Sequence, residues 1–229
     1  MFENSLTFVV PFYNERENLP KVVGDLLVMA RARCARFQIL CVDDGSSDGS
    51  AAALPQAPEL RVVTHPQNRG LTAALRTGFG AAATDWVTWV PADGQIPAGE
   101  VARILDAWNG HDLVLSTYRQ RPDGLVRLVM SRGLRLLLWV GVGLKDRVEG
   151  TYLFRRSLLD ELELVSRTSA GSVAFEIAAK CRRLGKRITS TEIECVPRLS
   201  GRSKVANARN IVATLGEIWR IRRSMRKII

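Results

Sequence analysis

Residues 37–49, with the sequence FQILCVDDGSSDG, carry the strongest indication of the fold. The first six form an almost continuous apolar run, which predicts a strand buried on both faces rather than an alternating, half-exposed one. The remaining seven, from Asp43 to Gly49, are turn-forming residues that end the strand in an acidic loop. Because strands buried on both faces are typical of parallel sheets covered by helices, this stretch predicts an α/β fold.

The same pattern recurs on either side of this stretch. Short apolar runs predict further strands, and segments with helical spacing of apolar residues or a high alanine content predict helices between them. The strands are expected at residues 6–10, 60–63, 86–90 and 112–115, with an edge strand at 188–196, and the helices at 18–33, 70–83, 101–108, 173–184 and 207–227. Their alternation predicts a mostly parallel sheet flanked by helices.

Three of the predicted loops at the carboxyl ends of strands are unusually polar. They cover residues 11–17, 43–50 and 91–95. Ligands of open α/β sheets bind beyond the carboxyl ends of the strands, so the active site is expected there. The acids of the second loop can accept hydrogen bonds from a ribose or a base, or hold a cation. A turn with solvated acids is the alternative for that loop.

Composition and charge restrict the partners of the chain. Its 229 residues suit one large domain or one domain with a small appendage, and 46% of them are hydrophobic. The formal net charge of +10 indicates nucleic acid, a membrane surface or phosphate-bearing substrates. Residues 202–229 hold eight positive charges and one negative charge, so the basic character belongs mainly to the C-terminal tail. A nucleic-acid binder is disfavoured, because the sequence has neither an interleaved aromatic–basic pattern nor a recognisable nucleic-acid module.

Cysteine spacing and hydropathy bear on the compartment. The four cysteines, at positions 34, 41, 181 and 195, form no CxxC pair, which favours buried thiols in a reducing compartment. No signal peptide precedes the first predicted strand. The longest apolar run, residues 136–144, is too short for a bilayer span, which needs about 20 residues. A helix that lies in the membrane interface is compatible with it.

Five short motifs, taken in order, resemble glycosyltransferase family 2. They are PFYNE at 11–15, VDDGSSDG at 42–49, NRG at 68–70, ADGQ at 92–95 and VPRLSGRSK at 196–204. The last looks like the VP…RxxGxSK element of dolichyl- and polyprenyl-phosphate sugar transferases, and Phe175-Glu176 precedes it as an aromatic–acid or aromatic–amide pair does there. The resemblance covers nearly the whole chain. It implies the GT-A fold, a Rossmann-like nucleotide-sugar-binding architecture.

The resemblance also implies a donor pocket. Pro11, Tyr13 and Glu15 would hold the nucleotide base and ribose. Val42 and Asp43 or Asp44 would complete that pocket.

Cations and a metal would hold the donor phosphates. Asp93, Arg119, Arg198 and Lys204 are the expected catalytic residues, with Ala92, Gln95, Arg132 and Ser203 as further donor-site residues. Guanidinium and ammonium groups suit this task because they stabilise phosphate charge. For Arg132, a solvated or snorkelling arginine is equally compatible.

One position departs from the family's pattern. Members usually carry Asp-x-Asp before the glutamine, and this chain has Pro91 in place of the first carboxylate. A divalent ion bridging a diphosphate takes one or two protein carboxylates and several waters. The expected ligands of Mg²⁺ or Mn²⁺ are therefore Asp93 and the amide oxygen of Gln95, with an affinity that Pro91 weakens. Weaker metal binding, a different donor and lost catalysis stay open as consequences, and Pro91 also serves to end the strand.

The implied reaction moves a sugar, with inversion, from a nucleoside-diphosphate sugar to dolichyl or undecaprenyl phosphate. Residues 119–145 mix aliphatic residues with arginines and predict a helix at the membrane interface. Residues 207–229 predict a basic amphipathic helix, with Ile211, Leu215, Ile218, Met225 and Ile229 at helical spacing, Trp219 beside them, and Arg220, Arg223 and Lys227 facing elsewhere. The alternative is an ordinary helix that packs on the domain. The expected organisation is a GT-A domain over 1–206 followed by this helix, peripheral on the cytoplasmic face of a membrane.

Other functions stay open at this stage. A family 2 transferase with a saccharide acceptor is disfavoured by the apolar residues 134–144. A non-catalytic nucleotide-sugar-binding or regulatory protein is conceivable because of Pro91. Action as a single chain, as a homo-oligomer or with a membrane partner subunit stays open, as do the sugar and the nucleotide.

Overall fold

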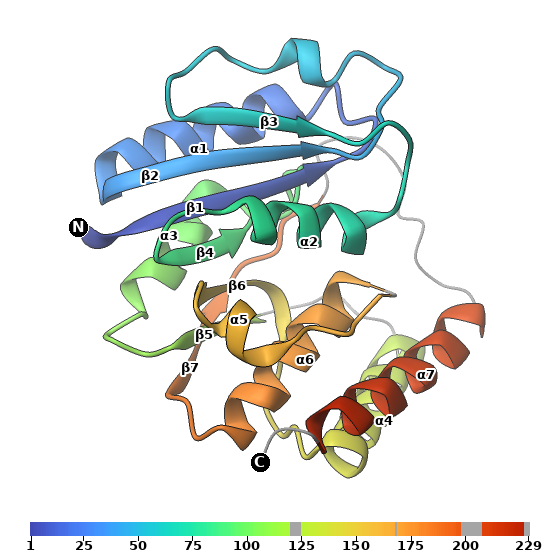
Figure 1. The fold of residues 1–229 in the computed structure, drawn as a ribbon. Helices are drawn as coiled ribbons and strands as arrows, with labels where there is room; N and C mark the ends of the chain where they lie inside the picture. The colour runs from blue at the N-terminus through green and yellow to red at the C-terminus, as the bar shows by residue number, and fades with distance from the viewer. Residues whose placement is uncertain (120–124, 168, 198–207, 227–229) are drawn as a thin grey trace.

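The structure is a computed structural model that describes residues 1–119, 125–167, 169–197 and 208–226. A seven-stranded sheet with the order β3-β2-β1-β4-β6-β5-β7 forms its centre (Figure 1). The strands are β1 (Phe2–Phe12), β2 (Cys34–Asp43), β3 (Leu60–Thr64), β4 (Trp86–Trp89), β5 (Leu113–Tyr118), β6 (Glu149–Arg155) and β7 (Ile188–Ile193). The pairs β1–β2, β2–β3, β1–β4 and β5–β7 are parallel, whereas β6 runs antiparallel to β4 and β5. The prediction of a mostly parallel sheet in an α/β fold is confirmed.

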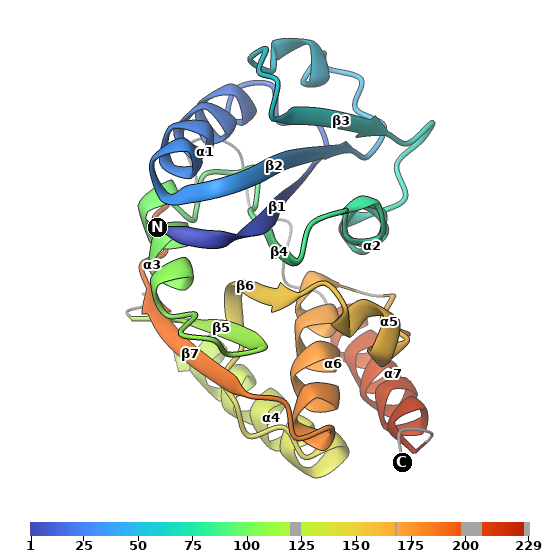
Figure 2. The same ribbon diagram turned by 60° about the vertical axis from the view of Figure 1, so that its left-hand side comes forward.

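Helices cover both faces of the sheet (Figure 2). The helices are α1 (Leu19–Arg33), η1 (Ala51–Ala53), α2 (Leu71–Ala81), α3 (Ala98–Asp106), α4 (Leu125–Val142), α5 (Leu158–Leu162), α6 (Ala170–Arg183) and α7 (Ala208–Met225). One buried cluster joins the sheet to α1 and α3, and the other joins it to α2, α4, α5, α6 and α7.

The central strands are buried on both faces because their side chains feed both clusters. On β2, Ile39 and Cys41 belong to the cluster with α1, and Leu40 and Val42 belong to the cluster with α2. All four side chains are fully buried. The apolar run in residues 37–42 therefore reflects a strand that is covered by helices on both faces, as predicted.

β6 is the strand that the sequence analysis did not predict. Its sequence, EGTYLFR, lies between β4 and β5 in space, although it follows β5 in the chain. The predicted edge strand at 188–196 is found as β7, at the edge of the sheet and ending at Ile193. Among the described residues, no helix is both long and apolar enough to cross a bilayer.

The apolar positions of α7 do not share one environment. Ile218 and Met225 are buried against the domain together with Ile221, whereas Leu215 is 45% exposed. The predicted helical spacing therefore includes residues of both kinds, because α7 packs on α4 and α6 through Ile218, Ile221 and Met225 and leaves Leu215 exposed. Ile229 and the Ile211 side chain lie outside the described part of the chain.

Candidate active site

The loops that follow β1 and β2 are tied together by side-chain hydrogen bonds. The Asn14 backbone N–H donates to Ser46 Oγ over 3.0 Å, and the Ser47 N–H donates back to Asn14 Oδ1 over 2.9 Å. The Glu15 N–H donates to Ser50 Oγ over 2.9 Å. These bonds hold residues 13–15 beside the acidic loop, with Tyr13 40% exposed at the edge of the sheet.

Asp43 and Asp44 end β2 and are both nearly buried. Asp43 Oδ1 accepts a hydrogen bond from the Ser46 N–H over 2.8 Å, which shapes the turn of its own loop. Asp44 Oδ1 lies 2.7 Å from His65 Nδ1 and 3.0 Å from the Arg69 N–H, and Asp44 Oδ2 lies 2.7 Å from the Gly70 N–H. Asp44 therefore holds the 68–70 segment, where α2 begins, against the acidic loop.

His65 completes this arrangement from the end of β3. Its Nε2 atom lies 2.9 Å from Thr77 Oγ1 on α2, and the ring is 5% exposed. Asp44 and Thr77 thus give each ring nitrogen of His65 a hydrogen-bond partner. The sequence analysis missed His65. The signal was available, because β3 neighbours β2 and its carboxyl end lies at the same edge of the sheet.

Gly45 lets the two loops approach each other. Its φ is +77°, and a Cβ there would lie 2.6 Å from the carbonyl carbon of Gln67. Any larger residue would push the 67–70 segment away from the acidic loop. Asp48 lies farther along the same loop. Burial raises its pKa, but hydrogen bonds from Ser50 and Arg16 outweigh this effect and hold the pKa below its usual range.

Asp93 and Gln95 follow β4 at the same edge. Asp93 is 9% exposed, and its Oδ1 accepts a hydrogen bond from the Gln95 N–H over 3.1 Å. The Gln95 carbonyl accepts from the Val196 N–H over 3.0 Å, and Gln95 Nε2 lies 4.0 Å from Cys195 Sγ. The loop with Asp93 is thus fixed to the chain that follows β7. Cys195, predicted to be buried, is only half-buried here.

The donor set at Asp93 fits a weakly held divalent ion. No group of three or more His, Cys, Asp or Glu side chains suited to a metal occurs among the residues that the structure describes. One carboxylate, the Asp93 side chain, and one amide, that of Gln95, meet the minimum for Mg²⁺, which takes its other ligands from substrate phosphates and water.

Arg119 lies beyond the end of β5. Its backbone N–H donates to the Ile193 carbonyl over 3.0 Å, which fixes it beside the end of β7. Its guanidinium forms ion pairs with Glu194, at 3.2 Å, and with Glu192, at 3.9 Å. These exposed pairs are weak, so an anionic ligand can replace the carboxylates.

The remaining predicted site residues fall into two groups. Pro11 and Val42 are buried near the ends of β1 and β2, and Ala92 is buried just after β4. Arg198, Ser203 and Lys204 lie outside the described residues, and Arg132 lies on α4 with a side chain that is not described. The structure brings Tyr13, Glu15, Asp43 and Asp44 together at one end of the edge, and the 194–196 segment joins Asp93 and Gln95 to Arg119.

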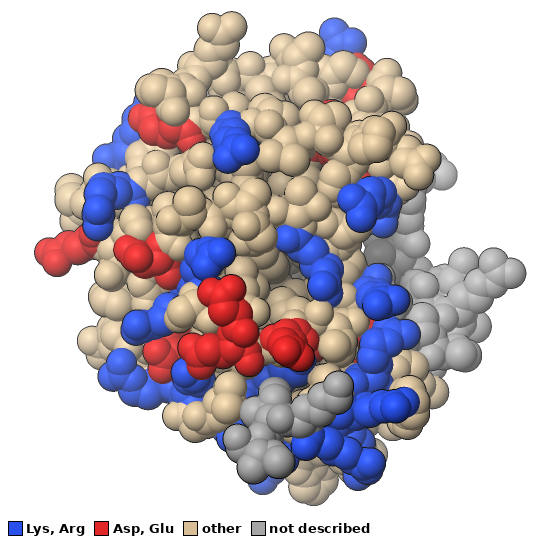
Figure 3. All heavy atoms as spheres, in the orientation of Figure 1, with Lys and Arg blue, Asp and Glu red and all other residues tan. Residues whose placement is uncertain are grey.

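A second surface feature lies on α4 and α7, which pack side by side (Figure 1). Six large apolar side chains there are between 42% and 67% exposed, namely Leu136, Leu137, Trp139, Val140, Leu215 and Trp219. We call these six the apolar face. Lys145 lies over the ring of Trp139, and Arg223 lies over the ring of Trp219. In Figure 3, basic side chains gather at the lower right over α7, where Arg220, Arg222, Arg223 and Arg226 are exposed.

One related sequence extends over nearly the whole chain and another over more than half of it. Polyprenol monophosphomannose synthase of Mycolicibacterium smegmatis is 34% identical over 93% of this chain and 86% of its own length. An undecaprenyl-phosphate 4-deoxy-4-formamido-L-arabinose transferase of Pectobacterium carotovorum is 34% identical over 58% of this chain, which spans 43% of the length of that relative.

Solved structures share the fold at lower identity. Glucosyl-3-phosphoglycerate synthase from Mycobacterium tuberculosis, in complex with Mn²⁺, uridine diphosphate and phosphoglyceric acid, has a TM-score of 0.70 at 20% identity, covering 97% of this chain and 78% of its own. A mannosyltransferase from Pyrobaculum calidifontis, in complex with GDP-Man and Mn²⁺, has a TM-score of 0.64 at 22% identity, covering 86% of this chain and 58% of its own. These neighbours confirm the expected GT-A-like fold.

The family itself is shown by its own model. Glycosyl transferase family 2 matches residues 7–163, which include part of β1, all of β2 to β6 and the loops after β1, β2 and β4. This chain therefore belongs to glycosyl transferase family 2 and is a glycosyltransferase.

Proposed function

We propose that this chain transfers a sugar, with inversion, from a nucleoside-diphosphate sugar to a polyprenyl phosphate at a membrane surface. The similarity to polyprenol monophosphomannose synthase over 93% of the chain carries this proposal, because it extends through the half that holds α4 and α7. The exposed apolar face on those helices supports a lipid-linked acceptor over a soluble one.

The donor nucleotide binds at the edge where β1 and β2 end. Pro11, Tyr13 and Glu15 contact the base and ribose, with Val42 and Asp43 or Asp44 completing the pocket. The bonds from Asn14 and Glu15 to the serines of the acidic loop support this assignment, because they fix both loops before the donor arrives. Asp44 contributes through the 68–70 segment as well, since both of its oxygens accept bonds from that segment.

The donor diphosphate lies between the Asp93 loop and Arg119. Ala92 borders it, and Asp93 and Gln95 hold a Mg²⁺ or Mn²⁺ ion, which supplies positive charge to the leaving diphosphate when bound. Both structural neighbours described above were solved with Mn²⁺. Arg119, Arg198 and Lys204 add fixed positive charge, with Arg132 and Ser203 as further phosphate contacts.

The chemical step needs no strong general base. A phosphate oxygen of the acceptor is already anionic at neutral pH and attacks the anomeric carbon from the face opposite the leaving group. The new carbon–oxygen bond forms as the bond to the nucleoside diphosphate breaks, and the diphosphate leaves with the electron pair. The residues of this chain therefore act by positioning both phosphates and stabilising the departing charge.

The acceptor reaches this edge from the membrane surface. α4 and α7 place their six exposed apolar side chains in the lipid interface, and the basic side chains of α7 bind anionic head groups. Three buried thiols, Cys34, Cys41 and Cys181, suit a reducing compartment and hence the cytoplasmic face. Whether one chain suffices, or a homo-oligomer or a membrane partner subunit is needed, follows from activity measured with the purified chain alone.

The test is transfer of label from a panel of nucleotide sugars into organic-extractable polyprenyl phosphate, with Mg²⁺, Mn²⁺ or chelator. We expect labelled lipid with one donor, and a loss of about 100-fold or more in Asp93→Ala. Asp160→Ala serves as the control, because Asp160 is an exposed aspartate on α5. Transfer only to a soluble acceptor, or no transfer with any donor, would contradict the proposal.

A further inference from the structure

Glu217 is a buried carboxylate on an otherwise basic helix. It is 1% exposed, and its Oε1 accepts a hydrogen bond from the Arg167 backbone N–H over 2.7 Å. Arg220, one turn along α7, pairs with the same oxygen at 2.9 Å. Burying a carboxylate is unfavourable unless its partners compensate for the lost water. The position of Glu217 therefore depends on its contacts with the Arg167 N–H and with Arg220.

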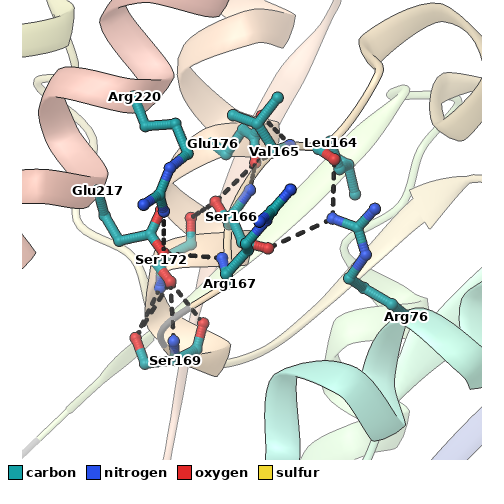
Figure 4. Close-up of polar contacts among 10 residues, drawn as sticks. All are labelled: Arg76, Leu164, Val165, Ser166, Arg167, Ser169, Ser172, Glu176, Glu217 and Arg220. Atoms are coloured by element: carbon teal, nitrogen blue, oxygen red, sulfur yellow. Dashed lines mark hydrogen bonds and ion pairs between the residues drawn. The ribbon is translucent and has the colours of Figure 1, made fainter. Parts of the chain in front are cut away.

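The segment that Glu217 reaches, residues 164–167, is held from two further helices (Figure 4). Glu176 on α6 is fully buried and accepts hydrogen bonds from the backbone N–H groups of Val165 and Ser166, at distances of 2.8–3.0 Å. Arg76 on α2 donates to the carbonyls of Leu164, over 2.8 Å, and Ser166, over 3.3 Å. Side chains from α2, α6 and α7 therefore meet on the backbone of one short segment. We call this segment the junction.

The apolar contacts of α7 do not fix its place in the same way. Ile218, Ile221 and Met225 are buried against the domain, and Ile218 packs directly on Gly141 of α4. Contacts between aliphatic side chains are not directional, so they orient a helix through shape alone. The hydrogen bond from the junction to Glu217 is directional, so it adds a constraint on the rotation of α7 that shape does not supply.

We propose that Glu217 is a positioning residue for sugar transfer to the lipid acceptor. It fixes α7 to the junction. Leu215 and Trp219 on α7 therefore keep their position relative to the apolar side chains of α4 and to the loops that follow β1, β2 and β4. α2, which begins at the 68–70 segment held by Asp44, is tied to the same junction through Arg76. The proposal rests on the proposed function, because it concerns delivery of the lipid phosphate to the donor.

The first test compares Glu217→Ala with Glu161→Ala, a partly exposed glutamate on α5 that pairs with Lys186. In Glu217→Ala we expect kcat with polyprenyl phosphate in vesicles to fall about tenfold or more, the effect of losing a hydrogen bond to a charged group. The KM for the nucleotide sugar, the Kd for the nucleoside diphosphate and binding to vesicles should stay within about twofold of the unaltered chain. Glu217→Gln, which keeps an acceptor oxygen, should be intermediate.

The second test restores the position of α7 by a covalent link. A Cβ at Gly141 would lie 3.9 Å from the Ile218 Cβ, which is within the usual range for a disulfide. The pair Gly141→Cys and Ile218→Cys, added to Glu217→Ala, should recover transfer when oxidised and lose it again on reduction. The same pair with Glu217 retained should be active in both states.

The outcomes separate this inference from the proposed function. Unchanged kcat in Glu217→Ala, loss of nucleoside-diphosphate binding together with kcat, or no recovery with the oxidised pair would each overturn the positioning role. Absence of transfer by the unaltered chain would overturn the proposed function, and this inference with it.

Discussion

Pro91 occupies the position at which the family pattern places the first metal-binding carboxylate. It lies just after β4. The last hydrogen bond between β4 and β1 is the one that the Val90 N–H donates to the Val9 carbonyl over 2.8 Å. A residue without an N–H is tolerated at the next position because the ladder has ended. With Pro91 at this position, Asp93 is the single carboxylate of the proposed metal site, which lowers the negative charge that a metal would meet.

Pro91→Asp should therefore strengthen metal binding. A second carboxylate adds charge and a ligand, so we expect the Mn²⁺ concentration for half-maximal transfer to fall by about tenfold. A metal titration of transfer activity measures this change. Pro97→Asp is the control, because Pro97 is exposed at the start of α3, on the other side of the same loop. An unchanged metal requirement in Pro91→Asp would contradict the assignment of Asp93 to the metal.

The four thiols should differ in reactivity. Burial raises the pKa of Cys34 to about 11 and the pKa of Cys41 and Cys181 to about 12, so these thiols stay protonated and inaccessible at pH 8. Cys195 is half-buried and contacts Gln95. We expect a disulfide reagent at pH 8 to modify Cys195 first, with the other three reacting only on unfolding.

The same raised thiol pKa values determine whether the stability of the folded protein rises or falls in alkali. An unfolded thiol ionises near pH 8.5, well below the pKa of each buried thiol. The contribution of these thiols to stability is therefore complete below about pH 8.5 and is lost as the pH rises toward 11 or 12. Four equally reactive thiols in the folded chain would contradict both statements.

At the scale of elements, α4 and α7 form a surface that ordinary packing does not explain. Trp139 and Trp219 are 51% and 63% exposed, although their neighbours Leu138 and Ile218 are buried. We expect Trp139→Ala and Trp219→Ala each to weaken binding to anionic vesicles by about tenfold, because interfacial binding scales with the apolar area buried. Co-sedimentation measures this. Val28→Ala, at a 71% exposed valine on α1, is the matched control and should bind as the unaltered chain does.

Apolar periodicity predicted most elements but not their environments. The strands around residues 37–42 and 86–90 were predicted because both of their faces are buried, and the helices were predicted from apolar spacing. β6 was not predicted. It runs antiparallel to β4 and β5, and no local sequence pattern encodes this reversal of strand direction. On α7, spacing grouped Leu215 with Ile218, but which stripe is covered depends on where α4 and α6 lie.

The same limit applies to the site. The acidic loop after β2 was expected from its turn residues, and the structure places it at the edge that the fold predicts. The contacts of Asp44 with His65 and Gly70 join residues 21 and 26 positions apart, and the contact of Glu217 with Arg167 spans 50 positions. Separations of this length depend on tertiary packing, so a sequence can suggest the participants without pairing them.

At the scale of the whole molecule, the first and second halves of the chain carry different parts of the proposed site. β1 to β4 lie together in the sheet and carry the Tyr13, Asp43 and Asp93 loops, whereas β5 to β7 and the helices α4 to α7 carry Arg119 and the apolar face. The two parts meet where β6 pairs with β4. Binding of the donor nucleotide is thus proposed for the first part and binding of the acceptor for the second, with the donor diphosphate and the chemical step at their shared edge.

This order has a consequence for synthesis on the ribosome. The strands β3-β2-β1-β4 are contiguous in the sheet and complete once residue 89 has emerged, so the loops after β1 and β2 can form while later parts of the chain are still unmade. Among the described helices α7 emerges last, and Glu217 reaches the junction only then. A nascent chain would therefore form the loops of its proposed nucleotide pocket well before it could bind a lipid surface.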